Sequence, residues 1–218
     1  MSGSAHVDPA AARSASDGLA VAPLRDAERE IAVEALARAF RDNPLNAAVI
    51  GAADPGRRLR SNRLGTALLL PLAQAHGEVW AARAGGDLLG VLVGTPPGAY
   101  PLPPGPLGAR LRCLVGQGWR AARGWARVFE ALDALHPVEP HWYLGTLGVD
   151  PRHQGRGAGA ALLRHWVGRA QDDAASAYLE TDLPENVGFY EREGFRVVEG
   201  AEVLGARVWC MRRPPPGG

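Results

Sequence analysis

The sequence predicts a single domain of the α/β class, of the α+β type, in which helices and strands follow one another without an internal repeat. A length of 218 residues suits one domain with a sizeable core. Two strand-like runs, 78–83 and 88–95, flank the pair Gly85-Gly86, which is a strong hairpin signal. An apolar run from Trp142 to Val149 precedes a glycine-rich turn and an amphipathic run, so we expect a strand, a turn and a helix there.

The first half of the chain supplies one further strand and several helices. Residues 19–24 have strand character, and Asp26 is a candidate N-cap for the helix that follows. A second helix is expected over 55–75. The segment 96–108 has six prolines and three glycines, which predicts irregular structure. The apolar pattern then becomes helical again over 107–135.

The second half continues with shorter elements. Its patterns predict a strand over 177–181, a short helix over 186–193, and last strands over 196–199 and 207–211. Residues 1–18 are small, polar and poor in apolar side chains, so we expect disorder there. The single domain is therefore expected to span 19–213, with a flexible tail over 214–218.

Composition excludes several classes of function. The formal net charge is only +1, which argues against a nucleic-acid binder held by bulk electrostatics. Cys113 and Cys210 lie far apart and form no metal or redox spacing, so we expect buried thiols and no metal site. No run of about 18 apolar residues is present, and the N-terminus has no signal architecture. We therefore expect a soluble cytoplasmic protein, monomeric or homodimeric, with no nucleic-acid or membrane partner.

An arginine-rich segment departs from this balance. No acidic residue lies between Asp87 and Glu130, and the chain has no lysine at all. One interpretation is a solvated arginine face; the other is a surface that meets an anionic group or a partner. The arginines of this segment are Arg110, Arg112, Arg120, Arg123 and Arg127.

The glycine-rich turn after the 142–149 strand carries the chemistry. It reads Gln154-Gly155-Arg156-Gly157-Ala158-Gly159 and opens the amphipathic helix. The first turn of a helix has backbone N–H groups without intrahelical partners, and the helix dipole makes that end partly positive. Glycines let a phosphate approach those groups without meeting a Cβ. The turn is therefore a candidate anion site. A Gly-x-Gly sequence without the preceding strand and the following helix would indicate only a tight turn.

A second motif, Asn186 to Phe195, completes a resemblance. Together the two motifs resemble the GNAT superfamily of N-acetyltransferases, with its (Gln/Arg)-x-x-Gly-x-(Gly/Ala) signature, and look closest to the puromycin N-acetyltransferase branch. The resemblance is strong over 139–212 and much looser over 19–135. The matching words are Glu139-Pro140, Trp142-Tyr143-Leu144, Gly148-Val149, His153-Gln154-Gly155, Leu179-Glu180-Thr181, Phe189-Tyr190-Glu191-Arg192 and Trp209-Cys210-Met211.

The resemblance implies a fold and a cosubstrate. The fold has a central mixed, mostly antiparallel, twisted sheet that splays between its fourth and fifth strands, with acetyl-CoA in the gap. The pantetheine arm would bind backbone groups of Leu147 and Val149, with Gly148 keeping that edge unobstructed. Asn186 is the next cofactor contact, or simply an N-cap. The pyrophosphate would bind around Gln154, Gly155, Arg156, Gly157, Ala158, Gly159 and Ala160, and Tyr190 would lie against the thioester.

The resemblance also implies the catalytic groups. Tyr190 occupies the family's position for the proton donor to the leaving sulfur, and a phenol suits a thiolate; its alternative role is a core aromatic residue. The oxyanion donor would be the backbone N–H of Val149 or a neighbour. Glu180 is the candidate base by strand alternation, with His141 as the other candidate. A covalent acetyl-cysteine route is not expected, because neither Cys113 nor Cys210 lies next to the glycine-rich signature or in a nucleophile motif.

These residues predict an acetyl-CoA-dependent N-acetyltransferase that works by direct attack in a ternary complex. The expected acceptor is a primary amine of a small molecule with apolar or aromatic bulk, such as a puromycin-like antibiotic, which would make the protein an antibiotic-resistance enzyme. Two alternatives stay open: a regulator that binds acetyl-CoA without turnover, and an enzyme that acetylates a protein or peptide amine.

Overall fold

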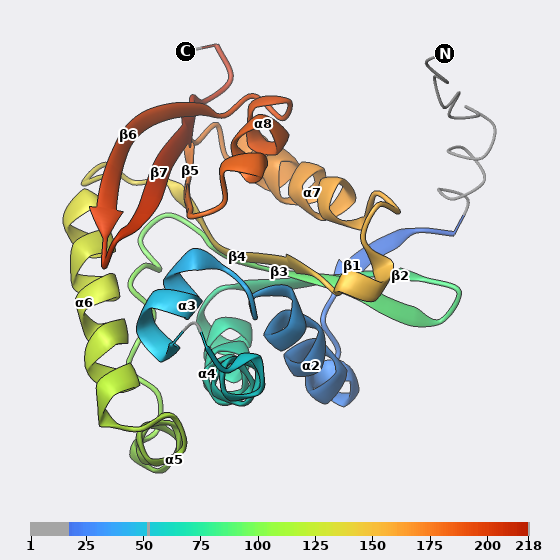
Figure 1. Ribbon diagram of the computed structural model, residues 1–218. Helices are drawn as coiled ribbons and strands as arrows, with labels where there is room; N and C mark the ends of the chain where they lie inside the picture. Colours follow the sequence, from blue (N-terminus) through green and yellow to red (C-terminus); the bar gives the residue numbers. More distant parts are fainter. Residues whose placement is uncertain (1–17, 52, 218) are drawn as a thin grey trace, which may run out of the picture.

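A computed structural model describes residues 18–51 and 53–217 (Figure 1). The expectation of disorder over 1–18 falls almost wholly outside these residues. The elements, in chain order, are β1 (Ala20–Pro23), the 3₁₀ turn η1 (Asp26–Glu28), α2 (Arg29–Ala39), α3 (Pro44–Ile50), α4 (Pro55–His76), β2 (Glu78–Ala84), β3 (Asp87–Thr95), α5 (Leu107–Gln117), α6 (Trp119–Leu135), β4 (Trp142–Val149), η2 (Pro151–His153), α7 (Ala158–Asp172), β5 (Ala177–Thr181), α8 (Pro184–Glu191), β6 (Arg196–Val203) and β7 (Ala206–Arg213).

The strands form one seven-stranded sheet in the order β1-β2-β3-β4-β5-β7-β6. Every neighbouring pair is antiparallel except β4 and β5, which run parallel. This confirms the predicted mixed, mostly antiparallel sheet. The hairpin between β2 and β3 also forms as expected, because Gly85 and Gly86 both take the positive φ angles that its tight turn requires.

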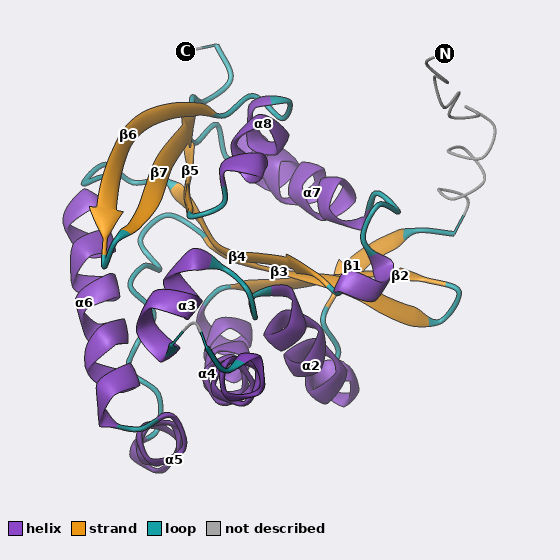
Figure 2. Cartoon of the chain, viewed as in Figure 1, coloured by secondary structure: helices purple, strands orange, loops and turns teal. Residues whose placement is uncertain are grey.

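Helices cover both faces of the sheet (Figure 2). α7 and α8 lie on one face, where Trp142, Trp166 and Tyr190 belong to the largest buried cluster. α2 and α4 lie on the other face, and their apolar side chains form a second cluster with β2 and β3. Gly94 is required for the close packing of α7, because a Cβ at that position would lie 2.2 Å from Nε1 of Trp166. The sheet is thus buried on both sides, as in a three-layer domain.

The structure corrects several predicted element boundaries. α3 was not predicted from the sequence, and its N-terminus is held by a distant group, since Oδ2 of Asp182 accepts a hydrogen bond from the Leu45 N–H at 2.9 Å. Asp26 begins a 3₁₀ turn instead of capping α2. The last two strands run to Val203 and Arg213, which are four and two residues further than predicted, because the glycine and charged residues at these ends hide the strand pattern.

The predicted helical region 107–135 forms two helices, α5 and α6, that depart from the layered body. α5 packs on α4, whereas α6 lies beside α3 and the β6–β7 hairpin (Figure 1). The side chains of Val49, Val128 and Val203 form a third buried cluster between these elements. This arrangement brings the C-terminal end of α6 towards the centre of the sheet, next to the candidate site.

Candidate active site

The two parallel strands at the centre of the sheet separate after a short paired stretch. β4 and β5 pair only from Trp142↔Ala177 to Leu144↔Leu179. Beyond this point β4 continues to Val149 and stays paired with β3 on its other side. The β5-facing edge of the second half of β4 therefore has free backbone groups, which an extended ligand can bind as an added strand does. This gap is the splay that the sequence predicted.

A β-bulge marks the place where the strands separate. Val93 lies opposite Thr146 and Gly94 lies opposite Leu144, so Gly145 is an extra residue on β4. A bulge changes which backbone groups of a strand point to each neighbour. The sequence analysis did not predict this bulge; a glycine inside a strand was its one signal.

The bulge turns two backbone N–H groups into the gap. Before the bulge, the N–H of Trp142 donates to the carbonyl oxygen of the residue that precedes β5, at 2.9 Å. After the bulge, the N–H of Asp150 donates to a carbonyl oxygen of β3, also at 2.9 Å. Because successive residues of a strand alternate, the N–H groups of Leu147 and Val149 point away from β3. Both residues are half-buried. They are the backbone groups that the sequence predicted for the cofactor arm and for the oxyanion.

The glycine-rich turn at the start of α7 is an open cradle. Gly155 and Gly157 have φ angles of +75° and +80°, and a Cβ on either would have no heavy atom within 4 Å. Gly157 is the N-cap of α7, yet no side chain caps this helix and its first turn contains no acid. By contrast, Oδ1 of Asp54 caps α4 at 2.8 Å. The free N–H groups at this end of α7 fit a phosphate group.

Gly148 has a different role from the predicted one. A Cβ at Gly148 would lie 2.6 Å from Cδ2 of Leu36 and 3.0 Å from Cε2 of Phe40. The missing side chain therefore makes room for α2 on the opposite face of the sheet, and not for a ligand at the strand edge. Gly148 positions the site through packing.

The remaining predicted cofactor residues are less closely grouped. Gln154 and Arg156 are exposed, and the guanidinium of Arg156 lies 3.3 Å from the His153 ring. Asn186 is the third residue of α8, which begins at Pro184, so the N-cap alternative is wrong. The Asn186 amide points back towards Oγ1 of Thr181 at 3.5 Å.

Tyr190 projects from α8 into the main core and is buried. Its ring packs edge-on against Phe189 and Phe195. Burial raises the pKa of its hydroxyl, and the negative charge of Asp182 raises that pKa further. The phenol therefore keeps its proton at neutral pH, and within the described residues its Oη has no hydrogen-bond partner. Such a group is free to donate.

Glu180 lies one residue beyond the last β4–β5 pair, on the sheet face opposite to Leu179. Its side chain is only 6% exposed. Burial and then the negative charge of Glu180 raise the pKa of the hydroxyls of Tyr143 and Tyr178, so the carboxylate lies close to both rings. Among the described residues, Oε1 of Glu180 has no hydrogen-bond partner.

A pair of histidines leads away from Glu180. Nδ1 of His136 lies 3.8 Å from Oε1 of Glu180, and Nε2 of His136 lies 3.0 Å from Nε2 of His141. Nδ1 of His141 is 2.7 Å from the carbonyl oxygen of Glu139, so this nitrogen carries a hydrogen. Burial lowers the pKa of His141, and in the neutral ring Nε2 accepts a hydrogen from His136. Nδ1 of His136 is then left as an acceptor facing Glu180.

The sequence indicated Glu180 and His141 as candidates but gave no sign of a role for His136. His136 follows the last residue of α6, far from Glu180 in sequence. The ring of Tyr100 stacks on that of His136, with centroids 3.9 Å apart, and burial raises the pKa of Tyr100 to about 12. Nothing in the local pattern around residue 136 indicates this contact. Only the fold brings the end of α6 and the 96–108 segment close to Glu180.

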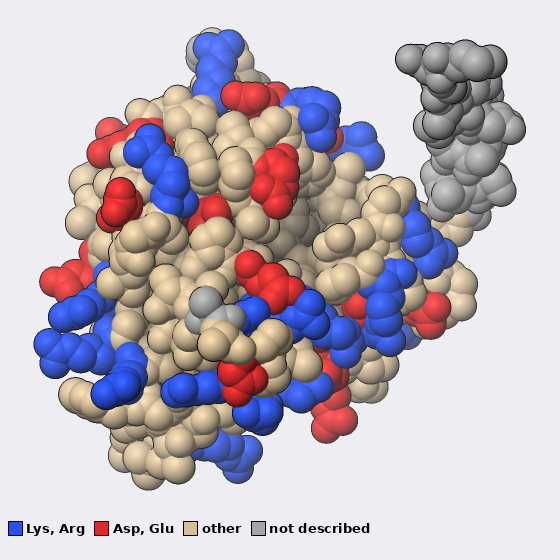
Figure 3. Space-filling model, in the orientation of Figure 1, with Lys and Arg blue, Asp and Glu red and all other residues tan. Residues whose placement is uncertain are grey.

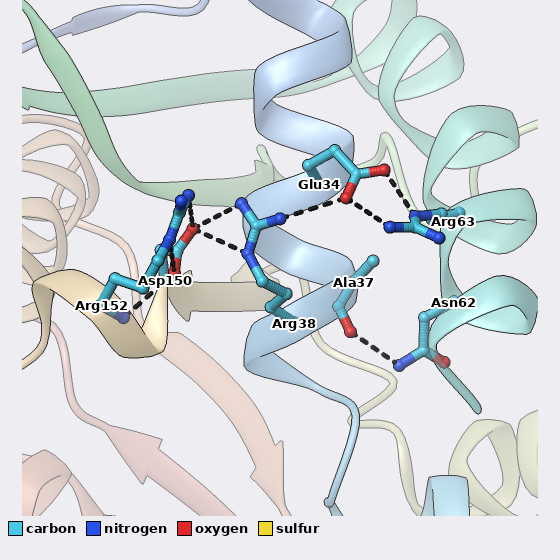
Figure 4. A network of polar contacts seen from close by, with 7 residues as sticks. All are labelled: Glu34, Ala37, Arg38, Asn62, Arg63, Asp150 and Arg152. Carbon is cyan, nitrogen blue, oxygen red and sulfur yellow. Dashed lines mark hydrogen bonds and ion pairs between the residues drawn. The ribbon is translucent and has the colours of Figure 1, made fainter. Parts of the chain in front are cut away.

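A network of ion pairs fixes the end of β4 (Figure 4). Asp150, which follows β4, is buried and accepts hydrogen bonds from Arg38 of α2 at 2.6 Å and from Arg152 at 2.8 Å. Burial alone would raise the pKa of Asp150, but these guanidinium groups outweigh it and hold the pKa well below its usual range. Glu34 links Arg38 to Arg63 of α4. The end of β4 is thereby tied to α2 and α4.

Comparison with known proteins identifies the family. A family model described as the acetyltransferase (GNAT) family matches residues 53–195. The chain belongs to the GNAT family of acetyltransferases. It is therefore an acyltransferase, and the matched range contains the strand gap, the glycine-rich turn and both catalytic candidates. This confirms the family resemblance seen in the sequence.

Individual GNAT proteins are similar to the chain to different degrees. An N-alpha-acetyltransferase RimI of Mycobacterium tuberculosis is 32% identical over 90 residues, a match that covers 39% of this chain and 57% of that protein. A solved structure described as histone acetyltransferase HPA2 and related acetyltransferase from Corynebacterium glutamicum has a TM-score of 0.71 and 26% identity, covering 92% of this chain and 98% of that one. Arylalkylamine N-acetyltransferase 2 from Aedes aegypti shares the fold, with a TM-score of 0.61, 15% identity, and coverage of 90% and 98%.

The described residues lack two kinds of feature, a metal site and a membrane-spanning helix. They contain no group of three or more His, Cys, Asp or Glu side chains that would hold a metal ion. Across the same residues, no helix combines the length and the apolar character that a membrane crossing needs. Burial raises the pKa of both Cys113 and Cys210, which makes each a poor nucleophile.

Proposed function

We propose that this GNAT protein transfers an acetyl group from acetyl-CoA to a primary amine of a small molecule, by direct attack in a ternary complex. One observation carries the proposal. The buried carboxylate of Glu180 lies one residue beyond the last β4–β5 pair, and the buried, protonated phenol of Tyr190 belongs to the cluster on the opposite face of the sheet. That is the arrangement in which one group removes a proton from an attacking amine while the other gives a proton to the leaving sulfur.

The residues around the gap fit acetyl-CoA. The open cradle of Gly155 and Gly157 would hold the pyrophosphate at the positive end of α7, and the free N–H groups of Leu147 and Val149 would bind the extended arm. When bound, acetyl-CoA supplies the activated acetyl thioester. The N–H of Val149 or a neighbour would then donate to the carbonyl oxygen of that acetyl group.

Glu180 takes a proton from the ammonium form of the acceptor, which frees the lone pair that attacks the carbonyl carbon. Nδ1 of His136 lies 3.8 Å from Oε1 of Glu180, so a small movement of either side chain would let the ring take this proton, while its Nε2 hydrogen is directed at His141. Tyr190 donates its hydroxyl proton as the carbon–sulfur bond breaks, so CoA leaves as the thiol. After the attack, the nitrogen loses a second proton as the tetrahedral intermediate collapses, and this proton restores the Tyr190 phenol through solvent. The products are an amide, CoA as the thiol, and the first proton, which leaves Glu180 for solvent.

The cluster around Glu180 favours an acceptor with a flat apolar part. Tyr100, His136, Tyr143 and Tyr178 form successive ring contacts with centroids between 3.9 and 6.2 Å apart. Aromatic rings beside a carboxylate suit an acceptor molecule that has a cationic amine close to an aromatic group. A puromycin-like antibiotic is such a molecule, and its acetylation would make this a resistance enzyme.

A second acceptor class has its own support. The N-alpha-acetyltransferase RimI of M. tuberculosis, by its description, acts on an α-amino group, and it is 32% identical over the matched 90 residues. A protein or peptide N-terminus is therefore the competing substrate. An acetyl-CoA-binding regulator without turnover is the third candidate, and it has no use for a free phenol beside the thioester.

Release of free thiol from acetyl-CoA, measured with a panel of amines, separates the three candidates. The panel contains puromycin, simple arylalkylamines and short peptides with free N-termini, and mass spectrometry identifies the acetylated product. We expect thiol release with the aromatic amines and none with the Glu180→Gln variant beyond a slow background. Efficient acetylation of peptides alone would replace the small-molecule proposal, and binding without thiol release from any amine would make the protein a regulator.

A further inference from the structure

α5 exposes an apolar stripe that the domain does not use. Leu107, Leu111, Leu114 and Val115 recur at the spacing of one helical face and are 77%, 56%, 38% and 77% exposed. Single exposed apolar residues are ordinary, but four on one face of an 11-residue helix form a continuous patch.

The opposite side of the same helix is the one that packs. Cys113 and Gln117 face the body, where Nε2 of Gln117 donates to the carbonyl oxygen of Ser61 at 2.9 Å. Gly116 lies so close to α4 that a Cβ would be 2.3 Å from Cδ1 of Leu64. The apolar stripe therefore cannot turn inwards without breaking these contacts. It is a fixed, outward-facing surface.

Arginines frame this stripe. At about 100° per residue, Arg110 falls on one flank of the stripe and Arg112 on the other. Arg120, Arg123 and Arg127 follow on α6 and line an open groove between α6, α3 and the turn of the β6–β7 hairpin. None of these five arginines forms an ion pair with an acid in the described part of the chain. Figure 3 shows several blue groups on the lower left of the molecule, where α5 and α6 lie in Figure 1.

An exposed tryptophan lies between the two helices. Trp119 begins α6, is 69% exposed, and lines the same groove as the arginines. Tryptophan favours the boundary between lipid head groups and acyl chains, where its ring is apolar and its N–H stays wet. A leucine stripe with flanking arginines and a tryptophan at one end is the pattern of a helix that lies in a bilayer surface.

We infer that α5 and the start of α6 form a docking surface for an anionic lipid bilayer. A second copy of the chain would bring the same unpaired arginines against each other, and a nucleic acid would leave the leucine stripe uncovered. An anionic bilayer satisfies both features, because acyl chains cover the stripe and phosphate groups pair with the arginines. The sequence-based expectation of no membrane partner relied on the absence of a spanning segment, and a helix lying in the surface needs none.

Docking in this way leaves the candidate active site free. α6 has 17 residues and therefore spans about 25 Å from Trp119 to the end beside His136. The strand gap and Glu180 lie at that far end. The surface would hold the enzyme at the membrane, where amphipathic amines concentrate, and it does not depend on which acceptor is correct.

Vesicle sedimentation with the full-length protein tests this inference. The probes are phosphatidylcholine vesicles with and without about 30% phosphatidylglycerol. We expect binding only to the anionic vesicles, weakened by salt, with a blue shift of tryptophan emission that the Trp119→Phe variant loses. Replacing both Arg110 and Arg112 with glutamine should weaken binding about tenfold or more, since each arginine near an anionic surface contributes roughly fivefold.

The apolar stripe has its own variant and matched controls. Leu111→Gln with Val115→Gln should also weaken vesicle binding about tenfold. Ile31→Gln, at a helical residue of α2 that is 53% exposed, and Arg192→Gln, at the end of α8, should leave it unchanged. Turnover of a water-soluble amine should be equal in all five variants, including Trp119→Phe, which shows that each is folded.

Three outcomes would overturn the inference. The first is equal binding to neutral and anionic vesicles, or binding to neither. The second is binding that the Leu111 and Val115 changes do not alter, since the contact would then be electrostatic only. The third is a dimer in analytical ultracentrifugation that those two changes dissociate, since the stripe would then join two copies. A protein that fails as an acetyltransferase but binds anionic vesicles would refute only the proposed function.

Discussion

The two sides of the β4–β5 gap are built in different ways. The proposed cofactor side presents backbone groups of two adjoining segments, the edge of β4 and the turn at the start of α7. The proposed acceptor side presents side chains from four segments: Glu180 from β5, His136 just after α6, Tyr143 from β4 and Tyr100 from the loop before α5. A site that binds through backbone groups needs glycines and a strand followed by a helix, and both can be recognised in a sequence. A site built from side chains of distant segments leaves no such pattern in the sequence.

The largest expected effect is on the cofactor side. Tyr190→Phe should lower turnover by about 100- to 10,000-fold, because the leaving sulfur loses its proton donor. Affinity for CoA and thermal stability should change little, since Oη of Tyr190 has no hydrogen-bond partner among the described residues and the ring packing stays the same. Stopped-flow thiol release and calorimetric titration with CoA measure the two effects. Full turnover in the variant would leave Tyr190 as a core aromatic residue.

Glu180→Gln tests the acceptor side, with an expected loss of about 10- to 1,000-fold in turnover at neutral pH. The deficit should narrow as the pH rises, because the free amine then needs no base. A purely structural role would give a deficit that does not depend on pH. Glu185→Gln, at an exposed acid in the first turn of α8, is the control and should keep wild-type turnover.

Asp150→Asn tests how strongly the end of β4 is held against α2. Removing the carboxylate leaves Arg38 without its main partner, so we expect a loss of about 3 kcal/mol in the free energy of unfolding, which is about a hundredfold in the folding equilibrium. The quarter-exposed Arg38 can turn to water, which keeps the loss at the lower end of the range for a buried pair. Chemical denaturation at pH 7 measures this loss, and a value below about 1 kcal/mol would mean that the network contributes little to holding β4 against α2.

The same carboxylate predicts a pH dependence. The folded-state pKa of Asp150 is lowered, so its contribution to stability is fully present above the unfolded pKa of about 4 and is lost as the pH falls towards the folded value. Unfolding free energies measured between about pH 6 and pH 3 should therefore fall less steeply in Asp150→Asn than in the wild type. Equal slopes would contradict the lowered pKa.

The smallest effects come from two glycines of α7. Gly159→Leu directs a side chain towards Val149 and Phe189, whose atoms lie 3.5 and 3.8 Å from an added Cβ, and should weaken CoA binding about tenfold through steric overlap with the bound arm. Gly168→Ala is the matched control: its Cβ meets nothing within 4 Å, so CoA affinity should not change and stability should rise by about 0.5–1 kcal/mol. Gly159 is preferable to Gly157, whose positive φ strains any substitution. Unchanged CoA affinity in Gly159→Leu would remove the start of α7 from the binding site.

The sequence by itself determined the fold class, the strand–turn–helix order and the place of the glycine-rich turn, because each depends on residues close together in the chain. It also identified Tyr190 and Glu180 as candidates. Only the tertiary structure decided that Gly148 packs against α2, that a bulge at Gly145 turns two N–H groups into the gap, and that His136 lies beside Glu180. Those facts depend on which distant segments pack together. The free energy of burying apolar surface is non-directional, so it leaves no local pattern in the sequence that would show which segments contact each other.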